Sequence, residues 1–293
     1  MKRPLHPALF VTLAALAFAT SGPLSRFARP THPLVVAFGR VALAGLVLVA
    51  FDVGGTTRAL RALSRENARL VVVAGGLLAL HFALFLWGLD LTSLPAGIAL
   101  VSLEPLSVVV FAWLLHGVVP RPLERVGVLV ATAGAVVVAS GRGTGEHRLL
   151  GDLLVLGAVA VYGLYVNLAR SCAAALPARV YAASVYGGAA LFLLPAVLLT
   201  PGARQGPLPP HGLLAIVGLA AVPTLIGHTA VQTGARSMSP STVALVSPGE
   251  TLGGLAIAAL LLHAVPTRLE LAGALLVLLG AVVSIRGAAR EAP

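Results

Sequence analysis

The sequence is poor in charged and aromatic residues and has almost no cysteine. Charged residues make up 10% of the 293 residues and aromatic residues 5%. A soluble domain carries about 25% charged residues, so this chain lacks the polar side chains that a water-exposed surface needs. The single Cys172 excludes an intramolecular disulfide and indicates no particular redox compartment. The composition therefore excludes a soluble globular domain.

Sequence motifs of the common enzyme classes are absent as well. The chain contains no His-Glu-x-x-His metal motif, no Walker A phosphate loop and no Gly-x-Ser-x-Gly nucleophile turn. We therefore expect no metal, no cofactor and no ATP-driven pumping. The net charge of +10 comes from basic residues scattered through short loops, without the concentrated basic patch of a nucleic-acid footprint. No nucleic-acid partner is expected.

Apolar residues are what the chain has in excess. They make up 58% of the sequence, with a mean hydropathy of +0.98, so the bilayer must be the solvent. Ten apolar stretches are each near the roughly 20 residues that a membrane-spanning helix needs. The sequence predicts an all-α integral membrane protein with ten transmembrane helices, at about 8–27, 33–53, 70–89, 94–116, 123–140, 150–171, 177–200, 212–234, 240–263 and 268–286.

The two halves of the chain resemble each other. The stretch Ala99-Leu-Val-Ser-Leu-Glu104-Pro105 has an echo 145 residues later in Ala244-Leu-Val-Ser-Pro248-Gly249-Glu250. The residues around these stretches match as well: His81 precedes Glu124 by 43 residues, and His228 precedes Glu270 by 42. These matches predict two homologous five-helix repeats, at residues 1–145 and 146–293.

The basic residues predict the orientation of these helices. Loops on the side of the N-terminus hold 13 arginine and lysine residues, and those on the opposite side hold 6. The positive-inside rule therefore places both termini in the cytoplasm. Because each repeat has an odd number of helices, the second repeat must enter the membrane inverted relative to the first. All but one of the basic residues are arginine, which indicates a GC-rich bacterial source.

Two carboxylates at the centre of the repeats mark a candidate site. Glu104 and Glu250 lie about ten residues into their helices from opposite faces, which is roughly 15 Å deep. Each has a proline beside it, which favours a kink or break. Inverted-repeat transporters keep their substrate site at this midplane depth. Alternatively, each carboxylate pairs structurally with Arg40, His81 or His228.

Other polar residues within the spans have two interpretations each. Arg40 either extends outward to the headgroups or contacts an anion or carboxylate inside the bundle. His81 and His228, at corresponding places, either bind substrate or make structural hydrogen bonds. Tyr162 and Asn167 either line a cavity or pack between helices.

The charges also predict different roles for Glu104 and Glu250. Since Arg40 belongs to the repeat of Glu104, we expect Glu104 to be ion-paired, whereas Glu250 titrates and couples protons.

These features together resemble the EamA transporters of the drug/metabolite transporter superfamily. The resemblance rests on the ten helices, the inverted five-helix repeat, the Phe18–Pro33–Arg40 spacing and Leu-Glu104-Pro105. It implies an inner-membrane carrier with a central cavity between the repeats, and many members export amino acids or related metabolites. The family often ends the fourth and ninth helices with Leu-Gly-Glu, whereas this chain reads Leu115-His116-Gly117 and Leu262-His263-Ala264.

The function best supported at this point is secondary transport. We expect an exporter of a small metabolite, such as an amino acid or related compound, working by alternating access in the bacterial plasma membrane. The lipid bilayer, the solute and coupled protons are the expected partners, and a homodimer remains open. An intramembrane enzyme or lipid-processing protein using Glu104 and Glu250, or a membrane scaffold, is the alternative. The inverted repeat favours transport, because mirror-related halves can exchange inward-open and outward-open states.

Overall fold

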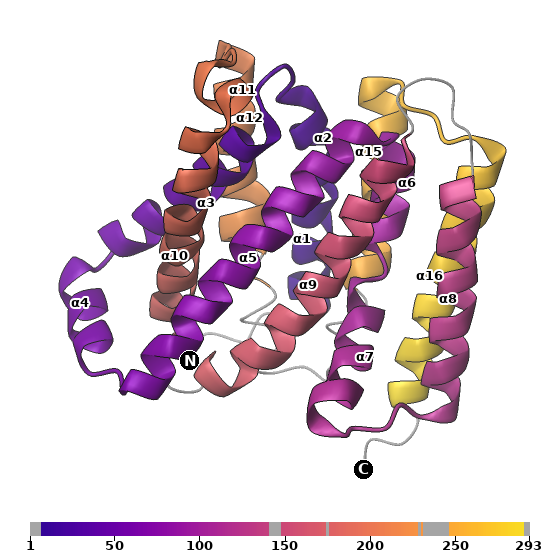
Figure 1. Ribbon diagram of the computed structural model, residues 1–293. Helices are drawn as coiled ribbons and strands as arrows, with labels where there is room; N and C mark the ends of the chain where they lie inside the picture. Colours follow the sequence, from indigo (N-terminus) through magenta and orange to yellow (C-terminus); the bar gives the residue numbers. More distant parts are fainter. Residues whose placement is uncertain (1–6, 141–147, 174–175, 228–229, 231–245, 290–293) are drawn as a thin grey trace.

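The computed structural model describes residues 7–140, 148–173, 176–227, 230 and 246–289, and every regular element in this part of the chain is a helix (Figure 1). The first half contains α1 (Pro7–Ala19), α2 (Ser21–Phe27), α3 (Pro33–Ala50), α4 (Val53–Arg61), α5 (Arg65–Leu91), α6 (Leu94–Val101), α7 (Glu104–His116) and α8 (Pro122–Ser140). The second half contains α9 (Leu149–Ala173), α10 (Ala178–Leu199), α11 (Pro201–Gln205), α12 (Pro210–Leu219), the π-helix η1 (Ala220–Gly227), α15 (Val246–Leu262) and α16 (Arg268–Ala289).

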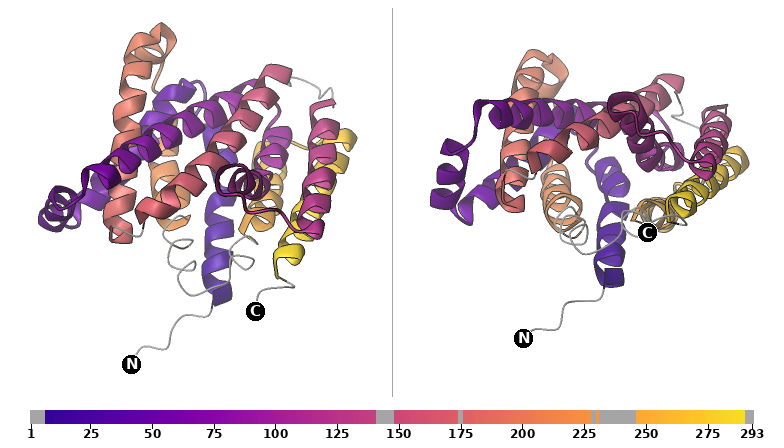
Figure 2. Two further views of the ribbon diagram at one scale, coloured as in Figure 1. Left: turned by 60° about the horizontal axis from the view of Figure 1, so that its bottom comes forward. Right: turned by 90° about the horizontal axis from the view of Figure 1, so that it is seen from below.

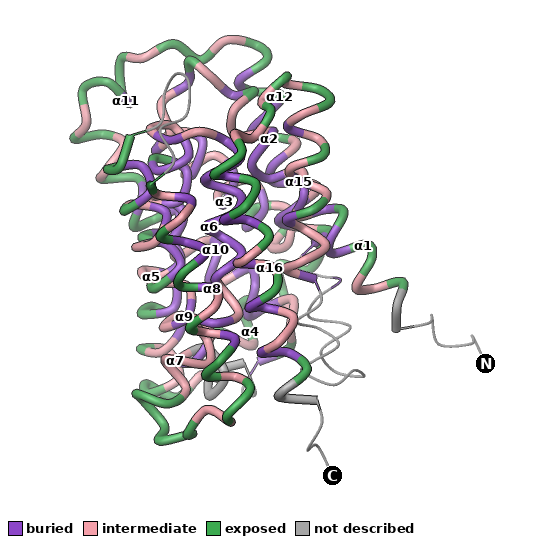
Figure 3. The backbone as a smooth tube through the Cα atoms, turned by 90° about the vertical axis from the view of Figure 1, so that its right-hand side faces the viewer, coloured by how far each residue is buried: buried purple, intermediate pink, exposed green. Residues whose placement is uncertain are grey.

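The lengths and composition of these helices confirm an all-helical membrane protein. Among the described residues, nine stretches of 18 to 27 residues are long and apolar enough to cross a membrane, and the apolar α15 is slightly shorter. Large apolar side chains cover the outside of the bundle, and Leu191, Leu199 and Leu260 are 72–82% exposed. Figure 3 shows buried residues concentrated along the middle of the bundle. This surface is suited to lipid rather than water.

Three of the predicted spans are interrupted, and each interruption accompanies a proline. The first span divides into α1 and α2 at Thr20, three residues before Pro23. The fourth divides into α6 and α7 just before Pro105, and the eighth continues as η1, which contains Pro223. Proline lacks the N–H that the helical ladder requires, and its ring crowds the carbonyl four residues earlier. The kink predicted at Pro105 is confirmed.

Two segments that connect predicted spans contain short helices. The connector at residues 52–69 holds α4, because the Asp52 carboxylate caps its start by accepting the Gly55 N–H at 2.7 Å. The connector at residues 201–210 holds α11, which begins at Pro201, a residue suited to the first helical position. In both cases a local signal at the first turn, a side-chain cap in α4 and a proline in α11, starts a helix that hydropathy does not reveal.

Helices from the two halves pack against each other in pairs. α8 packs along α16, α3 along α10, α1 along α15 and α7 along α9, while α5 also packs along α9. In Figure 2 the α8–α16 pair lies at one side of the molecule and the α3–α10 pair at the other. A site in the middle is therefore built from both halves.

Glycines set the spacing of the α8–α16 pair. Gly127 and Gly134 of α8 face Gly273 and Gly280 of α16, which are the corresponding residues of the other repeat. A Cβ atom on Gly134 would lie 2.7 Å from the Val277 nitrogen and 2.8 Å from the Gly273 carbonyl oxygen. The two backbones are therefore in contact, as small residues allow within a membrane.

Candidate functional site

The break between α6 and α7 places Glu104 at the start of a helix inside the bundle. Pro105 has no N–H to donate, and the Leu106 N–H bonds to the Leu103 carbonyl at 3.0 Å. The Ser102 carbonyl thereby loses its usual partner on Leu106, and the chain turns. Glu104 then occupies the first position of α7, where a helix N-terminus favours negative charge.

The corresponding segment of the second half meets this break directly. Ser247, the repeat counterpart of Ser102, donates its hydroxyl to the Ser102 carbonyl at 3.4 Å. The hydroxyls of Ser102 and Thr251 also share a short hydrogen bond. Glu250 precedes Thr251, so these contacts hold the two carboxylate-bearing segments together. Within its described length, Val246–Leu262, α15 runs through Pro248 without a break, since proline is tolerated in a first turn.

Arg40 of α3 points into the bundle and is only 2% exposed. Because Pro223 lacks an N–H, the Leu219 carbonyl has no α-helical partner four residues on, and the Thr224 hydroxyl donates to it at 2.7 Å. Thr224 Oγ1 then accepts the Arg40 Nε–H at 2.7 Å. Arg40 Nη1 donates to Ser21 Oγ, at the start of α2, at 3.2 Å. Arg40 therefore bridges the two halves instead of extending to the headgroups.

The charge of Arg40 acts on both carboxylates. Arg40 interacts electrostatically with Glu250 and, less strongly, with Glu104, and its guanidinium carbon lies 4.2 Å from the centre of the Phe82 ring. Among the described residues, its direct hydrogen bonds go to hydroxyls rather than to a carboxylate. The Glu104–Arg40 ion pair expected from the sequence is therefore not formed in this structure.

Glu104 faces His81 of α5. His81 Nδ1 lies 3.0 Å from the Ala158 carbonyl oxygen, which can only accept, so Nδ1 carries the hydrogen. In a neutral ring Nε2 is then an acceptor, and it lies 3.8 Å from Glu104 Oε1. A neutral His81 suits a protonated Glu104, and a charged His81 suits the carboxylate. No group of three metal-ligating side chains occurs among the described residues.

Aromatic rings form one wall beside Glu104. The His81 ring stacks on Phe85 with centroids 6.0 Å apart, and the Tyr162 ring lies 5.3 Å from that of His81. Tyr165 continues the wall, 6.2 Å from Tyr162. Tyr162 also interacts electrostatically with Glu104. Tyr162 is therefore packed against the ring of His81 and near Glu104.

Two other predicted residues have different positions. Asn167 is 1% exposed, and its Nδ2 donates to the Val108 carbonyl at 3.0 Å and the Gly163 carbonyl at 2.9 Å. It therefore joins α9 to α7. Its Oδ1 has no hydrogen-bond partner in the described structure. His228 lies outside the described residues.

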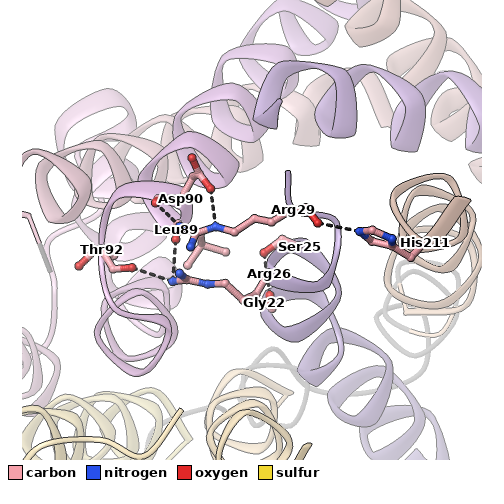
Figure 4. A network of polar contacts seen from close by, with 8 residues as sticks. All are labelled: Gly22, Ser25, Arg26, Arg29, Leu89, Asp90, Thr92 and His211. Atoms are coloured by element: carbon pink, nitrogen blue, oxygen red, sulfur yellow. Dashed lines mark hydrogen bonds and ion pairs between the residues drawn. The ribbon is translucent and has the colours of Figure 1, made fainter. Parts of the chain in front are cut away.

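A polar network closes one end of the bundle, at the top of Figure 1 (Figure 4). Arg29 Nε donates to Asp90 Oδ1 at 2.7 Å, and the Arg29 carbonyl lies 2.8 Å from His211 Nε2. Arg26 Nη2 donates to the Thr92 carbonyl at 2.7 Å. These bonds join the end of α2 to the end of α5 and to α12.

Two buried carboxylates extend this network into the second half. Asp152 at the start of α9 accepts the Thr92 hydroxyl at 2.6 Å, and Glu270 at the start of α16 accepts the Ser93 hydroxyl. Both are at most 2% exposed. Elements of both halves are therefore tied together at this end, above the level of Arg40.

Sequence inspection missed Ser21, Thr224 and Phe82, the residues that hold Arg40. A signal was present, since Thr224 follows Pro223 and Ser21 lies two residues before Pro23. A hydroxyl beside a proline in a membrane span can satisfy the carbonyl that the proline leaves free. Phe82 carries no such signal, because one more aromatic residue in an apolar span is unremarkable by itself.

Comparisons with known proteins agree with this architecture. The sequence profile of the EamA-like transporter family matches residues 6–140 and 149–286. No curated protein matches the chain. Among 26 matching chains of solved structures, one titled "Crystal structure of protein" covers 98% of this chain and 99% of its own length, with a TM-score of 0.69. At 21% sequence identity this likeness concerns the fold.

Proposed function

This chain belongs to the EamA-like transporter family, and on that premise we propose that it exports a small metabolite, such as an amino acid or related compound, by alternating access. It is a multi-pass integral membrane protein and a transporter rather than an enzyme. The observation that carries the proposal is the buried Arg40, which bridges the two halves through Thr224 and Ser21 and interacts electrostatically with Glu250 and Glu104.

The charges of this site suit a solute that carries both signs. Arg40 offers a cation to a carboxylate, and Glu250 and Glu104 offer anions to an ammonium group. The wall of His81 and Tyr162 gives an apolar or aromatic part of the solute a surface to pack against. An amino acid has all of these groups. Charges in a span are costly unless they are used or compensated, which supports a role in transport.

Proton coupling is assigned to the Glu104–His81 pair. Because Nδ1 is committed to Ala158, one proton can sit on either Glu104 or His81 Nε2. Glu250, by contrast, has the stronger interaction with Arg40. A proton bound at Glu104 and a solute ammonium group would then exclude each other, which makes exchange of the two obligatory.

The polar network around Arg29 and Asp90 supports alternating access. It ties both halves at one end of the site, so a solute could leave there only after these bonds break. In an inverted repeat the opposite end closes by the related movement. We propose that the two repeats, 1–145 and 146–293, perform this exchange in the bacterial plasma membrane, with the network on the outer side.

The orientation of the chain provides a first test. Tags at residues 1 and 293 are expected to react only from the cytoplasm, and a tag within 201–210 only from outside, because basic loops stay inside. Labelling of single-tag variants in whole cells and in inverted vesicles measures this. A cytoplasmic 201–210 segment would contradict the inverted repeat.

Flux of purified protein in liposomes tests the transport itself. Vesicles loaded with one unlabelled amino acid or related metabolite should accumulate the labelled compound from outside by exchange, for at least one compound of such a panel. An outward-directed solute gradient should also drive protons inward, read with a trapped pH dye. Protein-free vesicles and the Arg40→Ala variant are the controls. Absence of exchange for every compound, with inserted and monodisperse protein, would contradict the proposal.

A further inference from the structure

The short helix α4 (Val53–Arg61) lies beside the bundle rather than within it. It connects the end of α3 at Ala50 with the start of α5 at Arg65, and Figure 1 shows it standing away from the other helices at the left. Since α3 and α5 are both membrane spans, α4 is tethered at both ends to the level where the chain leaves the apolar layer. The region is independent of the transport site described above.

One side of this region carries apolar side chains without a protein partner to cover them. Thr56 is 4% exposed and Ala59 packs against the core, so these residues face the bundle. Phe51, Val53 and Leu60 are 76%, 58% and 40% exposed. At the boundary of a bilayer these three side chains can enter the acyl region, as those of interfacial helices do.

The same region carries a cluster of exposed arginines, namely Arg58, Arg61, Arg65 and Arg69. Arg58 makes only a long bond of 3.4 Å, to a backbone carbonyl of its own helix. The side chains of the other three arginines make no hydrogen bond or ion pair with any described residue. Their guanidinium groups are therefore available to a ligand.

The acidic residue at the start of α4 is bonded to Arg179 rather than to these four arginines. Asp52 accepts the Gly55 N–H at 2.7 Å and the Arg179 Nη2–H at 2.7 Å. These two bonds, together with the nearby positive charges of Arg179 and, to a smaller extent, Arg58, keep the pKa of Asp52 below its usual value. Arg179 belongs to α10, so the same pair fastens α4 to the bundle and fixes where its arginines lie.

We propose that α4 and the start of α5 form a binding site for anionic phospholipid headgroups. Phe51, Val53 and Leu60 enter the acyl boundary, and the four arginines bind lipid phosphates and neighbouring anionic groups. The guanidinium fork matches a phosphate in two-point geometry, and long arginine side chains extend from an apolar surface to the headgroup layer. A lipid is favoured over a soluble anion or a protein, because apolar anchors and cations lie together on one short segment, 51–69, at the membrane boundary.

Association of spin-labelled lipids with the reconstituted full-length protein tests this proposal. Wild-type protein should bind spin-labelled phosphatidylglycerol in preference to phosphatidylcholine. An arginine near an anionic surface strengthens association about fivefold, so Arg61→Gln/Arg65→Gln should lower the preference by about tenfold or more. Arg121→Gln/Arg125→Gln removes the same charge from the α7–α8 connection, where Arg125 Nε already donates to the Pro120 carbonyl at 2.8 Å. This control should change the lipid preference less than about twofold. Equal losses of this lipid preference in the two double variants, or no loss in Arg61→Gln/Arg65→Gln, would overturn the proposed lipid site.

Accessibility of nitroxide labels gives a second, independent measurement. Labels are placed at Leu60→Cys or Arg61→Cys in a Cys172→Ser background, in phosphatidylglycerol vesicles. The label at 60 should collide more with oxygen, which concentrates in the acyl region, and the label at 61 more with an aqueous nickel chelate. A label at 60 that prefers the nickel chelate would show α4 standing in water and would overturn the proposal, whatever the transport assay shows.

Discussion

Replacing Arg40 with alanine is expected to reduce solute flux about a hundredfold or more, while the protein still folds and inserts. The variant loses the cation that interacts with Glu250 and Glu104, so a solute carboxylate has no partner there. The fold can tolerate this loss, because each carboxyl group can bind a proton and become neutral. Flux in proteoliposomes measures the effect, and monodispersity in detergent reports folding.

Two further variants separate the charge of Arg40 from its geometry. Arg40→Lys should restore only part of the flux, since an ammonium group cannot reproduce the fork that reaches both Thr224 and Ser21. Ser21→Ala/Thr224→Val keeps the guanidinium but removes its two hydrogen bonds, and should reduce flux about tenfold. Full flux in Arg40→Ala would show that the cation is only structural.

Glu104→Gln is expected to abolish the pH dependence of flux and to stop proton movement coupled to the solute. Glutamine has the shape of the protonated carboxyl group but cannot release a proton, and His81 Nε2 then has no partner with which to share one. Exchange of solute for solute should become slower but persist. It needs no proton, and Glu250 still offers an anion to the ammonium group, whereas glutamine, like the protonated carboxyl group, does not. The measurements are flux against external pH and the signal of a trapped pH dye.

The matched variants make this assignment specific. Glu250→Gln should leave the pH dependence in place and weaken solute binding about tenfold or more, since Arg40 loses the carboxylate with which it interacts most strongly. Glu66→Gln, on the exposed first turn of α5, should change neither the pH dependence of flux nor solute binding. An unchanged pH profile in Glu104→Gln, or a flat profile in Glu250→Gln only, would contradict this assignment. It would support the one favoured by the sequence alone, in which Glu250 binds the coupled proton.

Much of the architecture follows from the sequence because a bilayer imposes its own periodicity. A span must be apolar over about 20 residues, so hydropathy locates α3, α5 and α10 to within a few residues. Proline interrupts the helical ladder by its own chemistry, so the break before Pro105 is local information. The echo around Ser102 and Ser247 identified two related halves, and the two family matches cover them.

The short helix α4 and the π-helix η1 could not be predicted from hydropathy or proline positions. α4 is capped by Asp52, but its apolar and basic residues together average to a polar segment, so hydropathy assigned it to a connector. The π-helix at Pro223 could not be predicted either, since a proline alone does not select between a kink and a wider turn.

The partners of the charged residues were decided only by the tertiary structure. From the sequence, Arg40 and Glu104 belong to one repeat and were expected to pair. In the fold, Arg40 binds Thr224, 184 residues away, and Glu104 faces His81. The physical reason is that sequence specifies what each helix contains but not its rotation about its axis. That rotation is set by contacts between helices, such as the backbone approach of Gly134 to Gly273.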